Sequence, residues 1–174
     1  MHNIKKKSNH TILFISCDEN YFVKYHPSHL RMYNNLIYFY KHKDFYVIVL
    51  QNNRDRHRED KNLKKDMICY YYKEIRIFNN RLVHFIDFNP FYITKIIKIL
   101  KKHKVDLIHV EFPYGINILR FLTIIPISYS SHNVEKLYWK NIGSYYFKIP
   151  SLLTSFYSLY IYIVKKYGVK IYSM

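Results

Sequence analysis

The sequence predicts an α/β domain of three layers, in which a mostly parallel sheet lies between two layers of helices. Four short apolar runs are rich in β-branched and aromatic residues and lack polar alternation through most of their length. This pattern is typical of strands buried on both faces, as in parallel sheets covered by helices. The segments between the runs carry a helical period, and this strand–helix–strand order gives right-handed crossovers between parallel strands.

The strands of this sheet are expected at the apolar runs. These runs are Thr11–Ser16, Phe45–Leu50, Val105–Val110 and Ile125–Ser130. A further strand is expected to begin at Val169–Tyr172. Arg54–Asp66 is dense in charges of both signs and is expected to be a solvated loop, whereas Met67–Phe78 holds one or two short strands.

The most regular helical pattern spans Asn89–His103. Isoleucine and leucine recur there at i, i+3, i+4 and i+7, and lysines take the opposite side. Asn89 is suited to be the N-cap, with Pro90 at the first helical position, where its missing N–H costs nothing. A second helix is expected over His29–Tyr40, with leucine, isoleucine and tyrosine on its inner face.

The length of 174 residues gives room for one globular domain, which we place at residues 11–174 after a basic tail at 1–10. The net charge of +16 indicates an anionic partner, such as a nucleic acid, an acidic membrane surface or a phosphorylated substrate. Part of this charge has a compositional origin, because the chain lacks Ala and is rich in residues with A/T-rich codons. Two cysteines, Cys17 and Cys69, are too few for a disulfide framework and favour a reducing, cytoplasmic compartment.

No segment of the sequence predicts a signal peptide or a membrane span. The apolar run Ile12–Ile15 is too short for the core of a signal peptide. The longest uncharged stretch, Ile149–Val164, contains Pro150 and falls short of the roughly 20 apolar residues that cross a bilayer. A buried or membrane-surface helix is expected there instead.

Polar and ionisable residues follow three of the predicted strands. They are Asp18, His29 and Arg31 after the first strand, Glu111, Tyr114 and Gly115 after the third, and His132, Asn133 and Glu135 after the fourth. Ligands of open α/β sheets gather outside the carboxyl ends of the strands. We therefore expect these side chains to converge on one edge of the sheet.

Local roles compete with ligand binding at some of these positions. Asp18 and Asn133 are equally suited to cap helices. Glu135 has nearly the capping-box spacing from His132, so local structure is an alternative explanation for it as well.

The remaining histidines, and the absence of several known motifs, limit the kinds of metal, cofactor and catalytic site that the sequence predicts. His26 and His29 have no third ligand in view, so no metal site is expected. His109 lies within a predicted strand and is expected to be a hydrogen-bonded core histidine. The sequence contains no Gly-x-Gly-x-x-Gly, no P-loop, no Asp-x-Asp and no Gly-x-Ser-x-Gly, which excludes the standard dinucleotide, phosphate-loop and nucleophile-elbow sites.

Four segments, taken in order, resemble one known family. They are Ile12–Ser16, Arg31-Met-Tyr-Asn-Asn-Leu36, Asp106-Leu-Ile-His-Val-Glu-Phe-Pro113 and, most specifically, Ser131-His-Asn-Val-Glu135. Together they resemble the N-terminal domain of the family 4 glycosyltransferases of GT-B fold, over residues 11–140.

The resemblance implies a Rossmann-like lobe, one half of a GT-B fold, on the acceptor side of a retaining, nucleotide-sugar-dependent glycosyltransferase. It implies a catalytic role for His132, whose imidazole would lie near the donor sugar. Glu111, Tyr114 and Gly115 would line the acceptor side. The other residues that would bind substrate are Asp18, His29, Arg31, Asn133 and Glu135. No metal or other cofactor is implied, because the nucleotide-sugar donor is a substrate.

The sequence differs from the family pattern in two places, and both differences affect the expected activity. Pro27-Ser28-His29 stands where the family has a Gly-Gly loop at the donor diphosphate, and no donor-binding domain follows in the chain. We therefore expect a truncated or split enzyme that needs a partner chain and has little activity alone. The lysine-rich C-terminal third suits a lipid-linked acceptor or an anionic membrane, at the inner face of which the protein would be peripheral.

Two alternatives stay open at this point. A nucleic-acid-binding module would also use a basic, tyrosine-rich surface, although no recognition motif is present. An inactive relic that only folds is the other alternative.

Overall fold

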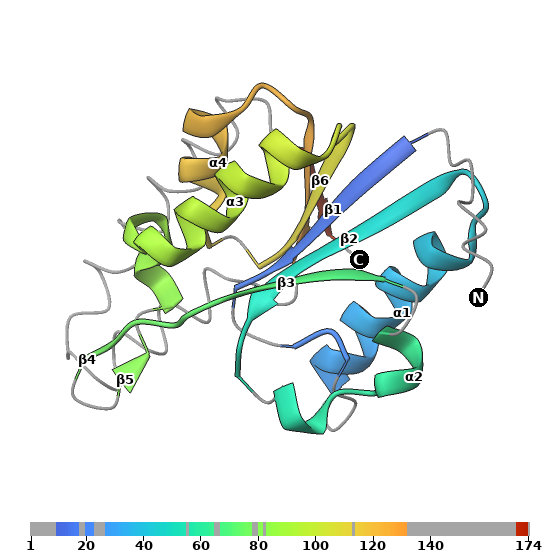
Figure 1. Ribbon diagram of the computed structural model, residues 1–174, viewed down its shortest axis with the longest axis horizontal. Helices are drawn as coiled ribbons and strands as arrows, with labels where there is room; N and C mark the ends of the chain where they lie inside the picture. Colours follow the sequence, from blue (N-terminus) through green and yellow to red (C-terminus); the bar gives the residue numbers. More distant parts are fainter. Residues whose placement is uncertain are drawn as a thin grey trace.

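The structure is a computed structural model. It describes residues 10–17, 20–22, 27–54, 56–64, 67–77, 80–81, 83–112, 114–131 and 170–173. A six-stranded sheet runs through the molecule, and every neighbouring pair of its strands is parallel (Figure 1). Its strands are β1 (His10–Ser16), β2 (Phe45–Asn52), β3 (Ile68–Tyr72), β6 (Leu107–Glu111), β7 (Ile127–Ser131) and β8 (Lys170–Ser173). The predicted parallel α/β fold is confirmed.

The strand order across this sheet is β3-β2-β1-β6-β7-β8. Counted along the chain within this sheet, that is the order 3-2-1-4-5-6 of doubly wound dinucleotide-binding folds. The chain leaves β1 toward β2 on one side and later returns to build β6 on the other side. The order therefore reverses between β1 and β6, and the carboxyl ends of these two strands form the switch point where such sheets bind ligands.

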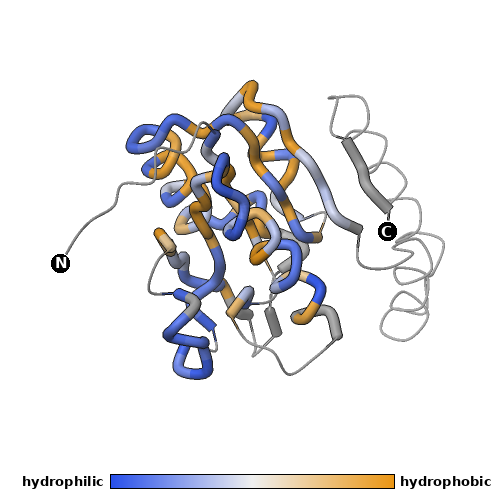
Figure 2. The backbone as a smooth tube through the Cα atoms, turned by 90° about the vertical axis from the view of Figure 1, so that its right-hand side faces the viewer, coloured by the Kyte–Doolittle hydropathy of each residue, from blue (hydrophilic) through white to orange (hydrophobic). Residues whose placement is uncertain are grey.

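Helices cover both faces of the sheet (Figure 1). The helix α1 (Pro27–Lys41) lies on one face, and α3 (Pro90–Lys102) and α4 (Ile116–Leu122) lie on the other. Successive side chains of β1 pack on opposite faces of the sheet. Leu13 packs in the core under α3 and α4, whereas Phe14 packs in the core under α1. Figure 2 shows hydrophobic and hydrophilic residues alternating along the helical coils, as expected for helices with one buried side.

The predicted start of α3 is confirmed in detail. Asn89 is extended, with φ −80° and ψ 110°, and its Oδ1 accepts hydrogen bonds from the backbone N–H groups of Phe91 at 2.9 Å and Tyr92 at 3.3 Å. Pro90 occupies the first turn. The Asn89 Nδ2 donates to the Lys73 carbonyl at 3.0 Å, which also ties the cap to the segment after β3.

Strand and helix boundaries differ from the predictions by one or two residues. β6 begins at Leu107 because Asp106 is engaged with the start of β1: its N–H donates to the Thr11 carbonyl at 2.9 Å, and its Oδ2 accepts from the Thr11 N–H at 2.8 Å. β7 begins at Ile127, after Pro126, which has no N–H to donate.

The region between β2 and α3 has more regular structure than the sequence predicts. It contains the 3₁₀-helix η1 (Arg56–Arg58), the short helix α2 (Lys61–Lys64), the antiparallel pair β4 (Arg76–Ile77) and β5 (Asn80–Arg81), and the 3₁₀-helix η2 (Val83–Phe88). Across the described ranges, no helix combines the length and apolar content needed to cross a membrane. The uncharged stretch 149–164 lies outside those ranges.

Candidate functional site

A row of buried polar residues lies at the carboxyl ends of the three strands around the switch point, β1, β6 and β7. Ser16 of β1 pairs in register with Glu111 of β6, and Glu111 pairs with Ser130 of β7. All three side chains are buried. Polar groups at this depth normally need hydrogen-bond partners, so the partners of this row define the site.

Glu111 is the centre of a chain of hydrogen bonds. Its Oε1 accepts from Asn35 Nδ2 of α1 at 3.1 Å and lies 3.3 Å from His109 Nε2. The other ring nitrogen, His109 Nδ1, lies 2.8 Å from Ser128 Oγ. Because a carboxylate only accepts, Nε2 carries a proton and donates to Glu111, and Nδ1 shares a hydrogen bond with the Ser128 hydroxyl. His109 is therefore the hydrogen-bonded core histidine that the sequence predicts.

Two buried hydroxyls at this end of the sheet, one after β1 and one on β7, have unused hydrogen-bonding capacity. Within the described part of the chain, neither Tyr21 Oη nor Ser130 Oγ has a hydrogen-bond partner. Burial raises the pKa of Tyr21 well above its ordinary value, and electrostatic interactions with Glu111 and then with Cys17 raise it further. Tyr21 therefore stays protonated and can donate a hydrogen bond at neutral pH.

The turn after β6 is held in an unusual backbone conformation. Phe112 has φ 73° and Gly115 has φ 81°, both in the left-handed region that L side chains rarely adopt. Gly115 precedes the first turn of α4, and a Cβ there would lie 2.6 Å from Tyr92 Oη. Glycine at this position is thus required by packing, and the strain at Phe112 marks a turn held in place by its surroundings.

Tyrosines surround the end of β1 on the opposite side of the sheet. The Cys17 thiol donates to the Tyr114 carbonyl at 3.2 Å, and Tyr72 Oη donates to the Cys17 carbonyl at 3.0 Å. Burial, followed by electrostatic interaction with Cys17, raises the pKa of Tyr92 well above its ordinary value. These contacts join the ends of β1, β3 and β6 into one rigid edge.

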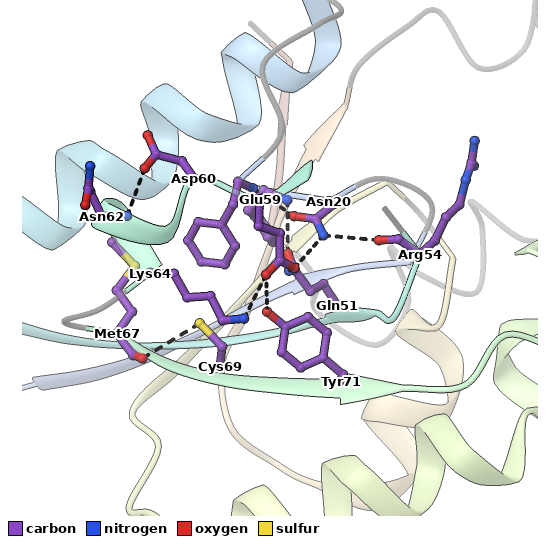
Figure 3. A network of polar contacts seen from close by, with 12 residues as sticks. Asn20, Gln51, Arg54, Glu59, Asp60, Asn62, Lys64, Met67, Cys69 and Tyr71 are labelled. Atoms are coloured by element: carbon purple, nitrogen blue, oxygen red, sulfur yellow. Dashed lines mark hydrogen bonds and ion pairs between the residues drawn. The ribbon is translucent and has the colours of Figure 1, made fainter. Parts of the chain in front are cut away.

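A second polar cluster, centred on Glu59, lies at the carboxyl ends of β2 and β3 (Figure 3). The side chain of Glu59 is buried and accepts four hydrogen bonds. The donors are Asn20 Nδ2 at 2.7 Å, Gln51 Nε2 at 2.9 Å, Lys64 Nζ at 2.8 Å and Tyr71 Oη at 2.8 Å. The expectation of a solvated loop over Arg54–Asp66 is wrong for Glu59. The cause is that its partners come from four separate segments, which no local spacing reveals.

The Glu59 cluster also positions Tyr21. Gln51 donates to Glu59 through Nε2 and accepts from the Tyr21 N–H through Oε1 at 3.0 Å. Asn20 Oδ1 accepts from the Phe22 N–H at 2.9 Å. The backbone of the loop after β1 is therefore held by the Glu59 cluster at Tyr21 and Phe22. Burial also raises the pKa of Cys69, beside this cluster, to about 12.

The predicted site residues divide into those that the structure describes and those that it does not. Glu111, Tyr114 and Gly115 come together at the end of β6, and Arg31 lies half-buried on α1. His29 lies in the first turn of α1, where its backbone alone is described. The others, which are Asp18, His132, Asn133 and Glu135, lie outside the described residues. Tyr21, Asn35, Ser130 and the Glu59 cluster are not among the predicted residues.

The described residues hold no group of three His, Cys, Asp or Glu side chains close enough to bind a metal ion. A comparison with models of known protein families finds no match, and neither does a comparison with curated protein sequences.

Proposed function

We propose that this chain is the acceptor-side lobe of a nucleotide-sugar-dependent glycosyltransferase. One observation carries the proposal: two buried hydroxyls have no hydrogen-bond partner among the described residues, and both belong to the switch-point end of the sheet, Tyr21 in the loop after β1 and Ser130 in register with Glu111. Hydroxyl and carboxylate groups at such an edge suit a ligand that is itself rich in hydroxyls.

The residues have different roles in this proposal. The Glu111 carboxylate already bonds to Asn35 and His109, so in this proposal it acts as a positioning residue that orients its neighbours. Tyr21 and Ser130 donate to or accept from sugar hydroxyls. The resemblance adds His132, just after β7, as the group near the donor sugar.

In this proposal, transfer also requires a second lobe that holds the nucleotide. The chain alone is expected to bind acceptor but to turn over little or nothing, because the donor diphosphate lacks its electrostatic partners. His132→Ala should abolish turnover once a donor lobe is supplied. The acceptor would be a sugar or a lipid-linked sugar at the inner face of a membrane.

Binding to the isolated chain tests the proposal. Calorimetric titration would use hexoses, nucleotide-sugars and a polyprenyl phosphate in detergent. We expect saturable binding of a hexose or of the polyprenyl phosphate, weakened about tenfold by Tyr21→Phe or Ser130→Ala, since loss of one good hydrogen bond costs about that factor.

A matched control separates ligand binding from folding. Each of these substitutions removes a buried hydroxyl that is unpaired among the described residues, so the free energy of unfolding should stay constant or rise. Tyr38→Phe changes an exposed tyrosine on the outer side of α1 and should leave both quantities unchanged. Absence of binding by every compound, or unaltered binding in both variants, would contradict the proposal.

A further inference from the structure

The outer surface of the η2, α3 and α4 layer exposes large apolar side chains. Six such side chains are exposed among the described residues, and four belong to this layer and the turn after it. They are Phe88 (78% exposed), Phe91 (47%), Phe121 (87%) and Ile124 (97%). Phe121 and Ile124 are close together in the chain, at the end of α4 and in the turn after it, and neighbouring exposed apolar side chains mark an interaction surface more often than single ones do.

The turn that presents Ile124 is held in place by hydrogen bonds. The Thr123 N–H donates to the Leu119 carbonyl at 2.9 Å, and the Ile125 N–H donates to Thr123 Oγ1 at 3.2 Å. Arg120 Nη1 donates to the Ile125 carbonyl at 3.0 Å. Ile124 therefore points outward from a fixed turn, at a position where its side chain contacts almost nothing in its own chain.

The same layer is strongly basic. Its lysines are Lys95, Lys98, Lys101, Lys102 and Lys104. In the part of the chain that the structure describes, none of them forms an ion pair. Asp87 is the one acidic residue from Val83 to Val105, and its Oδ1 is turned inward, where it accepts from the Ile118 N–H at 3.0 Å.

The sheet topology brings the two features together. α3 leads into β6 and α4 leads into β7, and these strands are parallel neighbours. The C-terminal ends of both helices therefore lie at the same edge of the sheet, and the Ile108 N–H donates to the Pro126 carbonyl there at 3.0 Å. Phe121 and Ile124 thus share an edge with Lys101 and Lys102.

We propose that this surface docks the protein on an anionic lipid bilayer, with Phe121 and Ile124 inserted among the acyl chains and the α3 lysines over the headgroups. Exposed apolar side chains beside unpaired cations match the two parts of such an interface. A second copy of the chain fits less well, because a self-complementary contact would set lysines against lysines. A nucleic acid fits less well too, because, of the two most exposed side chains, Phe121 alone has a π face on which a base can stack, and Ile124 has none.

This proposal stands apart from sugar transfer, since lipid binding is measured without turnover. The full chain would be sedimented with vesicles of phosphatidylcholine alone or of phosphatidylcholine with phosphatidylglycerol. We expect about tenfold stronger binding to the anionic vesicles, in line with several near-surface cations. Phe121→Ser with Ile124→Ser should weaken that binding about tenfold or more, since two large apolar side chains lose their burial. Lys98→Gln with Lys101→Gln and Lys102→Gln should remove the preference for anionic lipid.

The matched control lies on the opposite helical layer. Leu30 and Tyr38 are exposed on α1, so Leu30→Ser with Tyr38→Ser should leave binding unchanged. Equal sedimentation with both lipids, or equal losses in the α1 control, would overturn the proposal. So would dimerisation that Phe121→Ser with Ile124→Ser abolishes, seen by light scattering, or tighter binding of a single-stranded oligonucleotide that the same substitutions weaken.

Discussion

At the scale of single residues, Gly115 has to be glycine for two reasons, its backbone conformation and the lack of space for a side chain. Its φ of 81° is strained for any L residue, and a Cβ would lie 2.6 Å from Tyr92 Oη. We expect Gly115→Ala to lower the free energy of unfolding by about 2 to 4 kcal/mol, the sum of left-handed strain and overpacking. Chemical denaturation measures this loss.

A double mutant separates the two causes. Tyr92→Phe removes the hydroxyl that the new Cβ would strike, so part of the loss should be recovered when it is combined with Gly115→Ala. If the effects of the two substitutions simply add, the contact with the Tyr92 hydroxyl is not a cause of the loss.

Glu59 is the second residue on which the edge of the sheet depends. Its carboxylate accepts from four donors, and an amide in its place would set an NH₂ group against two of them. Glu59→Gln should lower the free energy of unfolding by about 2 to 4 kcal/mol, as for a buried charged hydrogen-bond network that loses its acceptor. Thermal and urea unfolding would measure it.

Lys61 provides the comparison within the same loop. It is exposed on α2, so Lys61→Gln should change stability by no more than about 0.5 kcal/mol. An equally small change in Glu59→Gln would show that the cluster does not hold the loop.

At the scale of elements, α3 depends on its N-cap. Asn89→Ala removes the acceptor for the Phe91 and Tyr92 N–H groups and should cost about 1 to 2 kcal/mol. Asn89→Asp keeps that acceptor and loses the donor to the Lys73 carbonyl, so its cost should be smaller. Equilibrium unfolding of both variants gives the comparison, and equal costs would mean that the cap contributes little.

The short helix α4 begins against a half-buried carboxylate, which makes its stability depend on pH. Burial raises the pKa of Asp87 above its ordinary value of 3.8, against the opposing hydrogen bonds from Ile118 and Asn117. The folded state therefore holds this proton more tightly than the unfolded state does. Stability from Asp87 is present below pH 3.8 and is lost as the pH rises through the folded-state pKa.

Asp87→Asn tests this assignment, because the amide oxygen still accepts from the Ile118 N–H but carries no charge. The variant should match the natural protein in acid and exceed it in stability at neutral pH. Asp87→Ala loses the acceptor as well and should be about 1 kcal/mol less stable than Asp87→Asn at either pH. Unfolding curves at several pH values test this prediction. If Asp87→Asn lost stability only at neutral pH, the direction inferred for the pKa shift of Asp87 would be wrong.

At the scale of the whole molecule, the parts that sequence predicts are those set by local pattern. The buried parallel strands can be predicted from the sequence because both of their faces are apolar. The helix α3 can be predicted because Asn89, Pro90 and the spacing of its isoleucines all indicate the same helix. The positions of Glu111, Tyr114 and Gly115 follow from the end of one such strand. Their hydrogen-bond partners do not, because Asn35 comes from a helix 76 residues away along the chain. The burial of Glu59 could not be predicted from the sequence for the same reason, because donors from separate segments bond to it.

The central claim is that the carboxyl ends of β1, β6 and β7 bind the ligand. The most direct measurement is amide chemical-shift mapping of the ¹⁵N-labelled chain during titration with a hexose and with a polyprenyl phosphate. We expect the largest shifts at Cys17, Gly115 and Ser131, which follow or end those strands, and none at Phe45 or Leu107 at the amino ends. Shifts confined to the amino ends, or no shifts with either compound, would contradict the account.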